Sequence, residues 1–385
     1  MTDAALQRTP FHEAIAPLNQ SMKWERWQGY ATVTHFYNEG MEYAAIRNSA
    51  SVYDISPMLK YAIEGPDAAR FLNRLLTRDI NRCKPGRCFY APWCDGEGKV
   101  IEDGTIFRFA EDRFQLNCAE HNLTWFRATA TGLDVDIRDV SADIAALSLQ
   151  GPMARDVLLR AGVDEVRDLR FFGVVETQLG DMPLTVTRTG FTGDLGYELW
   201  TERTHALDLW QRLMAAGQGR DLTPIGSTAL NIARVEAGYI QVHSEYQDAR
   251  VCVDPSEKRS PFELGLDWAV DLSKDHFNGR RALAAEQARG GPPLRLVGLE
   301  VEGRRPAVDS MLYAGKRIVG QTTAAVWSPL LKRSIALALV QREHALPGTV
   351  LGAEVDYRRE LRLLRSDQTA RVATPKFIDL ARRRA

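Results

Sequence analysis

A glycine-rich segment between two apolar runs constrains the fold of this chain more than any other stretch. Gly190, Gly193 and Gly196 recur every three residues within the sequence RTGFTGDLGYEL at positions 188–199. Glycine adopts backbone angles with φ above zero and lets a ligand approach the main chain closely. The segment therefore predicts a turn between two strands. It leaves two interpretations open, in which Glu198 either lies in solvent or points at a bound ligand.

Length and composition indicate the class of protein. A chain of 385 residues predicts two or three domains, because single hydrophobic cores rarely grow beyond about 250–300 residues. Hydrophobic residues make up 45% and charged residues 26%, which is typical of a soluble globular protein. The net charge of −1 predicts no basic surface, so no nucleic acid is expected as a partner. We expect the basic run at residues 382–384 to be a solvated tail.

The cysteines and the apolar runs indicate the compartment. The five cysteines form no CxxC pair, so they predict free thiols in a reducing cytoplasm and no metal site. No stretch approaches the roughly 18 apolar residues of a membrane span, and residues 1–8 lack the apolar core of a signal peptide. We therefore expect a cytoplasmic protein with no membrane partner.

Short helices and strands follow one another before residue 289 without a regular βαβ repeat, which indicates the α+β class. Residues 39–48 predict an amphipathic helix, and Asp67 is a plausible N-cap for a helix over residues 68–76. Residues 289–293, of sequence RGGPP, form the clearest linker in the chain. Beyond them, short apolar strands separated by turn residues predict an all-β barrel or sandwich.

A second segment ends in a pair of acids. Residues 90–103, of sequence YAPWCDGEGKVIED, begin with Tyr90, pass a glycine turn and end in Glu102 and Asp103. Successive side chains of a strand point to opposite faces, so only one of these acids can face a pocket. We expect the other acid, Glu102, on the outer face.

These two segments resemble signature regions of the tetrahydrofolate-dependent aminomethyltransferase family, which includes the glycine-cleavage T-protein and several folate-dependent demethylases. Other blocks match in the same order, from Thr9 to the region near Pro375, so the resemblance covers nearly the whole chain. It implies two α+β lobes, at residues 1–140 and 141–288, and a C-terminal β-barrel at residues 294–385. These units would surround a channel that holds tetrahydrofolate.

The resemblance also implies roles for individual residues. Asp103 matches the family's catalytic aspartate beside N5 and N10 of the folate, where a carboxylate can stabilise positive charge and relay a proton. Glu198 matches a glutamate that accepts two hydrogen bonds from the pterin edge. The other residues expected to contact tetrahydrofolate are Tyr90, Asn117, Phe172, Phe191, Arg234 and Trp268. For three of them an alternative stays open: Asn117 caps a turn, Arg234 forms an internal ion pair, or Trp268 packs in the core.

Departures from the T-protein pattern favour the demethylase branch of the family. Pro57 stands where T-proteins have His, and Phe172 and Phe191 stand where they have Tyr. The favoured function is therefore a methyltransferase, or demethylase, that moves a methyl group from a small methylated substrate to N5 of tetrahydrofolate. An aryl ether, a betaine or a sulfonium would be a suitable donor. The residues considered for contact with that substrate are His35, Tyr37, Lys60, Tyr61 and His243.

Two alternative functions stay open. A true T-protein would take an aminomethyl group from a lipoylated carrier protein. A folate-binding accessory protein would share the fold without catalysing a reaction. The presence of Asp103 together with Glu198 argues for catalysis.

Overall fold

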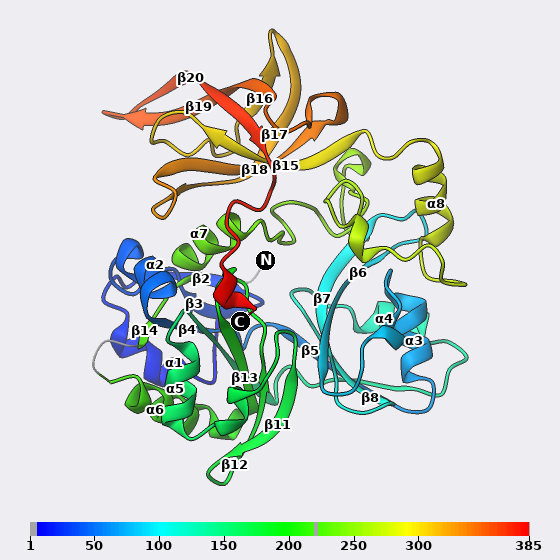
Figure 1. Ribbon diagram of the computed structural model, residues 1–385, viewed down its shortest axis with the longest axis vertical. Helices are drawn as coiled ribbons and strands as arrows, with labels where there is room; N and C mark the ends of the chain where they lie inside the picture. Colours follow the sequence, from blue (N-terminus) through cyan, green and yellow to red (C-terminus); the bar gives the residue numbers. More distant parts are fainter. Residues whose placement is uncertain (1–5, 219–221, 385) are drawn as a thin grey trace.

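The computed structural model describes residues 6–218 and 222–384, which form two α+β lobes and a C-terminal β-barrel (Figure 1). The expected fold class is therefore confirmed. In this view the lobes lie side by side below the barrel. No helix within these residues is long and apolar enough to cross a membrane.

The first lobe is built on a six-stranded sheet with the strand order β11-β12-β13-β10-β4-β14. Its strands are β4 (Ala50–Asp54), β10 (Ile144–Gln150), β11 (Val174–Leu179), β12 (Met182–Thr187), β13 (Gly196–Glu202) and β14 (Leu222–Pro224). Apolar side chains on one face pack against α5 (Ala154–Ala161) and α6 (Ala206–Ala216). The helices α2 (Glu39–Asn48) and α7 (Ser227–Ala237) pack on the other face. Short N-terminal elements complete this lobe: β1 (Gln7–Arg8), α1 (His12–Ile15), β2 (Trp24–Trp27) and β3 (Tyr30–Val33).

The second lobe is built on a five-stranded sheet with the strand order β6-β7-β8-β5-β9. Its strands are β5 (Leu59–Glu64), β6 (Arg87–Cys94), β7 (Val100–Arg108), β8 (Arg113–Cys118) and β9 (Asp136–Asp139). The helices α3 (Ala68–Leu75) and α4 (Leu123–Thr129) cover its apolar face. After this lobe α8 (Arg280–Ala288) precedes the linker to the barrel.

The two lobes interleave in the sequence. The strand β4 pairs with β10, with Asp54 opposite Leu147, although β5 to β9 of the other lobe lie between them in the chain. The division expected at residue 140 therefore does not follow the sheets. The reason is that strands far apart in the sequence pair with each other, and the hydrophobic periodicity of a strand does not indicate its partner.

A closed barrel of six strands begins at Leu294, directly after the linker. Its strands are β15 (Leu294–Val301), β16 (Met311–Ala314), β17 (Arg317–Ser328), β18 (Arg333–Gln341), β19 (Val350–Arg359) and β20 (Arg362–Ala373). Its interior is a separate cluster of Val, Leu and Ala side chains.

Residues 374–384, here called the C-terminal arm, leave the barrel and return to the first lobe (Figure 1). The carbonyl oxygen of Glu236, near the end of α7, accepts two amide hydrogen bonds from the arm, at 3.0 and 3.1 Å. The arm ends in a short 3-10 helix, η8 (Ala381–Arg383). There Arg382 pairs with the buried carboxylate of Asp194 at 2.7 Å. The expectation of a solvated basic tail is therefore wrong.

Local sequence determines several helix ends. The side chain of Asn38 accepts a hydrogen bond from the first turn of α2, which spans the expected residues 39–48. α7 ends at Gly238, which takes the left-handed conformation with φ 71°. Asp67 precedes α3 as expected, but its carboxylate accepts a hydrogen bond from the amide of Asp134 at 2.9 Å instead of capping the helix.

Candidate functional site

Asp103 lies on β7, and a tyrosine hydroxyl group binds its carboxylate. The hydroxyl of Tyr246, from the loop after α7, donates to Asp103 Oδ1. The hydroxyl of Tyr90, on the neighbouring strand β6, also lowers the pKa of this carboxyl group. Burial raises the pKa of Asp103, and the two tyrosine hydroxyl groups offset part of the rise. A carboxyl group with a raised pKa is suited to proton exchange closer to neutral pH.

The adjacent acid, Glu102, points to the opposite face of β7 as expected, but that face is covered. Glu102 is only 1% exposed. Its carboxylate accepts hydrogen bonds from the amides of Ala119 and Glu120 and from the side chain of Asn122. The outer position expected for Glu102 is therefore wrong, because the loop at residues 119–122 folds over this face. Glu102 holds that loop in place and does not face the pocket.

Glu198 lies on β13, directly after the glycine-rich segment. Its Oε2 atom accepts hydrogen bonds from the hydroxyl groups of Thr189 at 2.7 Å and Thr187 at 3.4 Å. Burial raises the pKa of Glu198, and the two hydroxyl groups lower it in part. No donor from the described residues binds Oε1. One oxygen of this half-buried carboxylate is therefore oriented by the protein and the other is available to a ligand.

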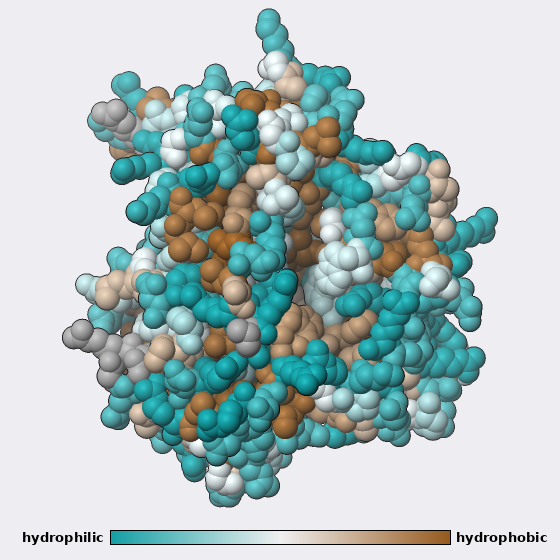
Figure 2. Space-filling view, in the orientation of Figure 1, coloured by the Kyte–Doolittle hydropathy of each residue, from teal (hydrophilic) through white to brown (hydrophobic). Residues whose placement is uncertain are grey.

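One strand, β6, links the two acids. The pKa of the Cys88 thiol is raised by burial and by the charge of Glu198. The pKa of the Tyr90 hydroxyl is raised by burial and by Asp103. Residues two apart on a strand share a face and lie about 7 Å from each other. The charges of Asp103 and Glu198 thus act on two residues of the same strand, so both acids lie near β6. A recess with apolar walls is visible where the lobes and the barrel meet (Figure 2).

Further aromatic rings pack against Tyr90, whose hydroxyl acts on Asp103. The ring of Trp268 stacks on that of Tyr90, with 5.7 Å between the centroids and an interplanar angle of 24°. The guanidinium of Arg78 lies 5.1 Å from the Trp268 ring and 3.8 Å from that of Phe89. Trp268 is 62% exposed, which excludes the alternative that it packs in the core. It forms an exposed apolar surface beside Tyr90.

A second group of aromatic rings lies beside the glycine-rich segment. The ring of Phe191 stacks on that of Tyr239, with 5.6 Å between the centroids and an angle of 22°. The guanidinium of Arg383, from the C-terminal arm, lies 5.6 Å from the Tyr239 ring and 4.9 Å from the Phe171 ring. The ring of Phe172 packs edge-on against that of Phe171, with 4.8 Å between the ring centroids. The backbone of Phe172 has a positive φ of 59°. The two expected Phe residues thus lie in one aromatic cluster.

Arg234 and Asn117, which were also expected to contact folate, form hydrogen bonds with other residues of the protein instead. Arg234 is 2% exposed, and its Nη1 atom donates to Glu245 Oε2 at 2.7 Å. The structure therefore shows the internal ion pair, which was the alternative for this residue. Asn117 is 1% exposed and bonds to the carbonyl of Thr105 and the side chain of Gln115. It bridges strands of the second sheet instead of capping a turn or facing a ligand.

Lys60 and Tyr61 do not face the channel, so their expected contact with a substrate is wrong. Both are 0% exposed. Lys60 Nζ donates to the carbonyl of Ser56 at 2.6 Å, and burial lowers its pKa to about 8. The Tyr61 hydroxyl accepts a hydrogen bond from the amide of Asn122 at 2.9 Å. Both side chains are used to hold the second sheet against its neighbours.

The three remaining substrate candidates do not form one group. Tyr37 is 66% exposed, and His35 is half-buried near β3. The imidazole of His243 lies 3.1 Å from Glu120 Oε1, which also accepts a hydrogen bond from Gln28 at 2.8 Å. His243 belongs to the same turn as Tyr246, because its amide donates to the carbonyl of that residue at 2.8 Å. His243 is thus the candidate that is connected to the partner of Asp103.

Three residues of the site, Tyr239, Tyr246 and Arg383, were not anticipated from the sequence. Tyr246 meets Asp103 across 143 residues of chain. Neither tyrosine stands in a motif, and an arginine in a basic terminal run gives no sign of a docked position. Only the path of the loop after α7 and of the C-terminal arm places them in the site.

Comparison with known proteins identifies relatives over nearly the whole chain. Residues 10–274 match the family model described as the GCVT N-terminal domain, and residues 295–379 match the glycine cleavage T-protein C-terminal barrel domain. An aminomethyltransferase of Streptomyces coelicolor is 33% identical over 93% of this chain and 95% of its own length. An aminomethyltransferase of Desulfitobacterium hafniense is 32% identical, with coverage of 90% and 93%.

A solved structure supports the fold. The glycine cleavage system aminomethyltransferase T from Bartonella henselae superposes with a TM-score of 0.85, over 97% of this chain and 98% of that chain. Its sequence identity is 24%, so this likeness concerns the fold alone.

Proposed function

Because the chain belongs to the glycine cleavage T-protein family, whose members use tetrahydrofolate, we propose that it is a one-carbon transferase that acts as an aminomethyltransferase. The names of its relatives support this function over the methyl transfer that the sequence departures favoured. The observation that supports the proposal is that Asp103 and Glu198 are two carboxylates near the same strand, β6, each oriented by a hydroxyl group.

The residues present fit a reduced pterin. A pterin edge offers adjacent N–H donors, and Glu198 has one oxygen fixed by threonines and one without a donor among the described residues. Aromatic rings at both acids provide flat apolar surface, from Trp268 at one and Phe191 at the other. When bound, tetrahydrofolate would supply N5 as the acceptor of the one-carbon unit.

Asp103 is proposed as the catalytic residue. Release of an amine requires a proton, and a carboxyl group with a raised pKa can hold and return one near neutral pH. Its ionised form would also stabilise positive charge that develops nearby. Tyr246 and Tyr90 would fix its orientation. A lipoylated carrier protein is the proposed aminomethyl donor.

Methyl transfer from a small methylated substrate is the second candidate, and two observations favour it. Pro57, buried in the turn after β4, provides no imidazole. Tyr246 provides a hydroxyl proton at Asp103, and an aryl ether oxygen needs a proton when it leaves as a phenol.

A direct assay distinguishes the two candidates. The purified chain is incubated with tetrahydrofolate and either an aminomethylated lipoyl carrier or a set of aryl ethers, betaines and sulfonium acids. Folate-dependent release of ammonia supports the aminomethyltransferase, whereas formation of 5-methyltetrahydrofolate supports the methyltransferase. Asp103→Asn should lower either turnover by about 10²–10⁴-fold while folate binding persists. Glu97→Gln, at an exposed acid of the same hairpin, is the matched control. Turnover unaffected by Asp103→Asn would contradict the proposed catalytic role.

A further inference from the structure

Tyr246 ends a short turn that begins at Gln241. The amide of Glu245 donates to the carbonyl of Gln241 at 3.1 Å, within this turn. The amide of His243 donates to the carbonyl of Tyr246 at 2.8 Å, and His243 takes the left-handed conformation with φ 66°. A residue other than glycine keeps such a conformation only where its surroundings hold it. The position of the Tyr246 hydroxyl group on Asp103 therefore depends on what holds this turn.

The carboxylate of Glu245 ties the turn to α7. Its Oε2 atom accepts hydrogen bonds from Arg234 Nη1 at 2.7 Å and from the amide of Gln241 at 2.8 Å. Both charged side chains are buried, with Glu245 1% and Arg234 2% exposed. Burial raises the pKa of Glu245, and the charge of Arg234 offsets part of the rise. A buried, charged hydrogen bond of this kind fixes the turn relative to the helix.

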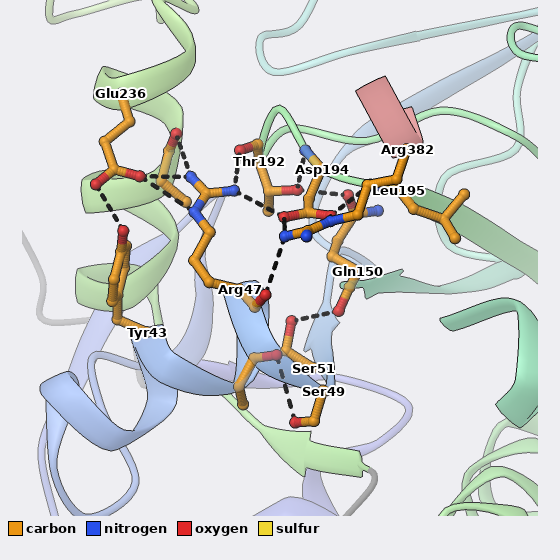
Figure 3. Close-up of polar contacts among 12 residues, drawn as sticks. Tyr43, Arg47, Ser49, Ser51, Gln150, Thr192, Asp194, Leu195, Glu236 and Arg382 are labelled. Carbon is orange, nitrogen blue, oxygen red and sulfur yellow. Dashed lines mark hydrogen bonds and ion pairs between the residues drawn. The ribbon is translucent and has the colours of Figure 1, made fainter. Parts of the chain in front are cut away.

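The end of α7 that carries Arg234 is itself held in place. Two residues further along the helix, Glu236 Oε2 lies 2.6 Å from Arg47 Nη2, and the hydroxyl of Tyr43 donates to Glu236 Oε1 at 2.6 Å (Figure 3). Arg47 Nη1 also lies 3.3 Å from Asp194 Oδ2, in the glycine-rich segment. Arg234 therefore holds the turn against a helix end that is anchored to the first lobe.

The barrel supplies the second contact to Glu245. The hydroxyl of Thr323, on β17, donates to Glu245 Oε1 at 3.1 Å and lies 3.2 Å from the carbonyl of Leu337, its alternative acceptor. Thr323 lies where the register of β17 against β18 shifts, between Thr322 and Ala324. A β-bulge re-aims a side chain away from the regular alternation of a strand. The two oxygens of one carboxylate thus bind two parts of the molecule, the first lobe and the barrel.

We propose that Glu245 is a positioning residue, which holds the Tyr246 hydroxyl group on the carboxylate of Asp103. It acts through Arg234 on one side and Thr323 on the other. The inference rests on the proposed function, in which Asp103 is the catalytic residue. Glu245 and Tyr246 are consecutive in the chain, so a shift of one moves the other. A displacement of about 1 Å takes a hydroxyl group out of hydrogen-bond range and alters a catalytic geometry.

The titration of Asp103 reports where the Tyr246 hydroxyl group lies. Burial raises the pKa of Asp103, and the hydroxyl groups of Tyr246 and Tyr90 lower it. The adjacent carboxyl group of Glu102 has its own pKa raised by burial and by the charge of Asp103. Changes in the turn leave Tyr90 and Glu102 in place, so they should reach Asp103 through Tyr246.

The test measures the pKa of Asp103 on the full chain by infrared spectroscopy, from the carboxyl band that Asp103→Asn removes. Thr323→Val deletes a hydroxyl group without changing any charge, and it should raise this pKa by about 0.5–1. Glu245→Gln removes the ion pair and should raise the pKa further, toward its value in Tyr246→Phe. In the Tyr246→Phe background, Thr323→Val should add nothing, because its effect passes through the missing hydroxyl group.

Thr322→Val is the matched control on the same strand. The hydroxyl of Thr322 donates to the carbonyl of Ala307 at 2.7 Å and accepts from the amide of Ser310 at 2.8 Å, both within the barrel. Its removal should lower stability and leave the pKa of Asp103 unchanged.

Three results would overturn the positioning role. They are an unchanged pKa of Asp103 in Thr323→Val, an equal rise in Thr322→Val, or a further rise when Thr323→Val is added to Tyr246→Phe. Thermal unfolding identifies a variant that does not fold, and Thr323→Val decides alone if Glu245→Gln is such a variant. If the wild type turns over neither donor, the proposed function fails, whereas the pKa values still decide whether Glu245 places the hydroxyl group.

Discussion

The hydroxyl group of Tyr246 is positioned to control the protonation of Asp103. Burial raises the pKa of this carboxyl group, whereas the hydroxyl groups of Tyr246 and Tyr90 favour the ionised form and lower it. Tyr246→Phe removes one donor, so the pKa of Asp103 should rise further. The ionised carboxylate is then lost at a higher pH, and the acidic limb of kcat/KM against pH should move upward. Tyr37→Phe, at an exposed ring, should leave the profile unchanged.

Lys60 should make the stability of the protein depend on pH. Burial lowers its pKa from 10.5 to about 8, so the unfolded chain binds the proton more tightly than the folded protein. The free energy of unfolding should therefore rise between pH 8 and pH 10.5, by up to about 3 kcal/mol. Urea unfolding at several pH values measures this rise. Lys60→Met should reduce the rise and leave the part that Lys274 contributes, because burial lowers the pKa of Lys274 to about 8 as well. Lys84→Met, at an exposed lysine, should leave the whole rise. If the free energy of unfolding changed with pH in the same way in the wild type and in Lys60→Met, the assignment of this pH dependence to Lys60 would be wrong.

At the residue scale, the sequence identified the two acids and their aromatic surroundings more reliably than the role of each polar residue. Asp103, Phe191 and Glu198 are half-buried and Trp268 is exposed, so each keeps some accessible surface. Arg234, Asn117 and Lys60 do not, since other parts of the protein satisfy their polar atoms. A motif gives the type of a residue at a position, but whether its donors are free depends on neighbours from distant segments.

At the scale of elements, the end of α7 couples a helix terminus to the C-terminal arm. Gly238 has a φ of 71°, and a Cβ atom there would meet the carbonyl oxygen of Pro375 at 2.5 Å. Gly162 ends α5 with a φ of 96° and has nothing within 4 Å of such an atom. Both Gly→Ala changes strain the left-handed conformation, by about 1–2 kcal/mol. Only Gly238→Ala also displaces the arm.

Gly238→Ala should therefore lower the free energy of unfolding by at least about 1 kcal/mol more than Gly162→Ala does. Urea unfolding of the two variants gives this difference. Limited proteolysis should also cut the arm faster in Gly238→Ala. Equal stability of the two variants would show that the contact with Pro375 relaxes without cost.

At the scale of the whole molecule, the carboxylate of Glu236 joins three parts of the chain. It binds Arg47 and Tyr43 from α2, and the hydroxyl of Ser328 from the barrel donates to the same group. Glu236 is 0% exposed. Glu236→Ala would remove one of the two carboxylates that balance the charge of the buried Arg47 guanidinium. It should therefore destabilise the protein by about 3–5 kcal/mol.

A surface ion pair provides the comparison. Glu176 binds Arg113 at 2.5 Å, and both side chains are exposed. Glu176→Ala should cost less than about 1 kcal/mol, because exposed pairs are screened and contribute little. Chemical unfolding of the two variants measures the difference. A loss for Glu236→Ala as small as that for Glu176→Ala would mean that the buried network does not hold the lobes and the barrel together.

The sequence by itself determined the α+β class, the barrel after the linker, helices such as α2 and α7, and the two acids. These features depend on neighbours within a few residues: the spacing of apolar side chains, a capping side chain, or a glycine with positive φ. The tertiary structure alone decided the rest. It interleaved the lobes through the pairing of β4 with β10, covered Glu102 with a loop, brought Tyr246 to Asp103 and docked Arg382 on Asp194. Each of these contacts joins distant segments, so it exists only once the chain has folded.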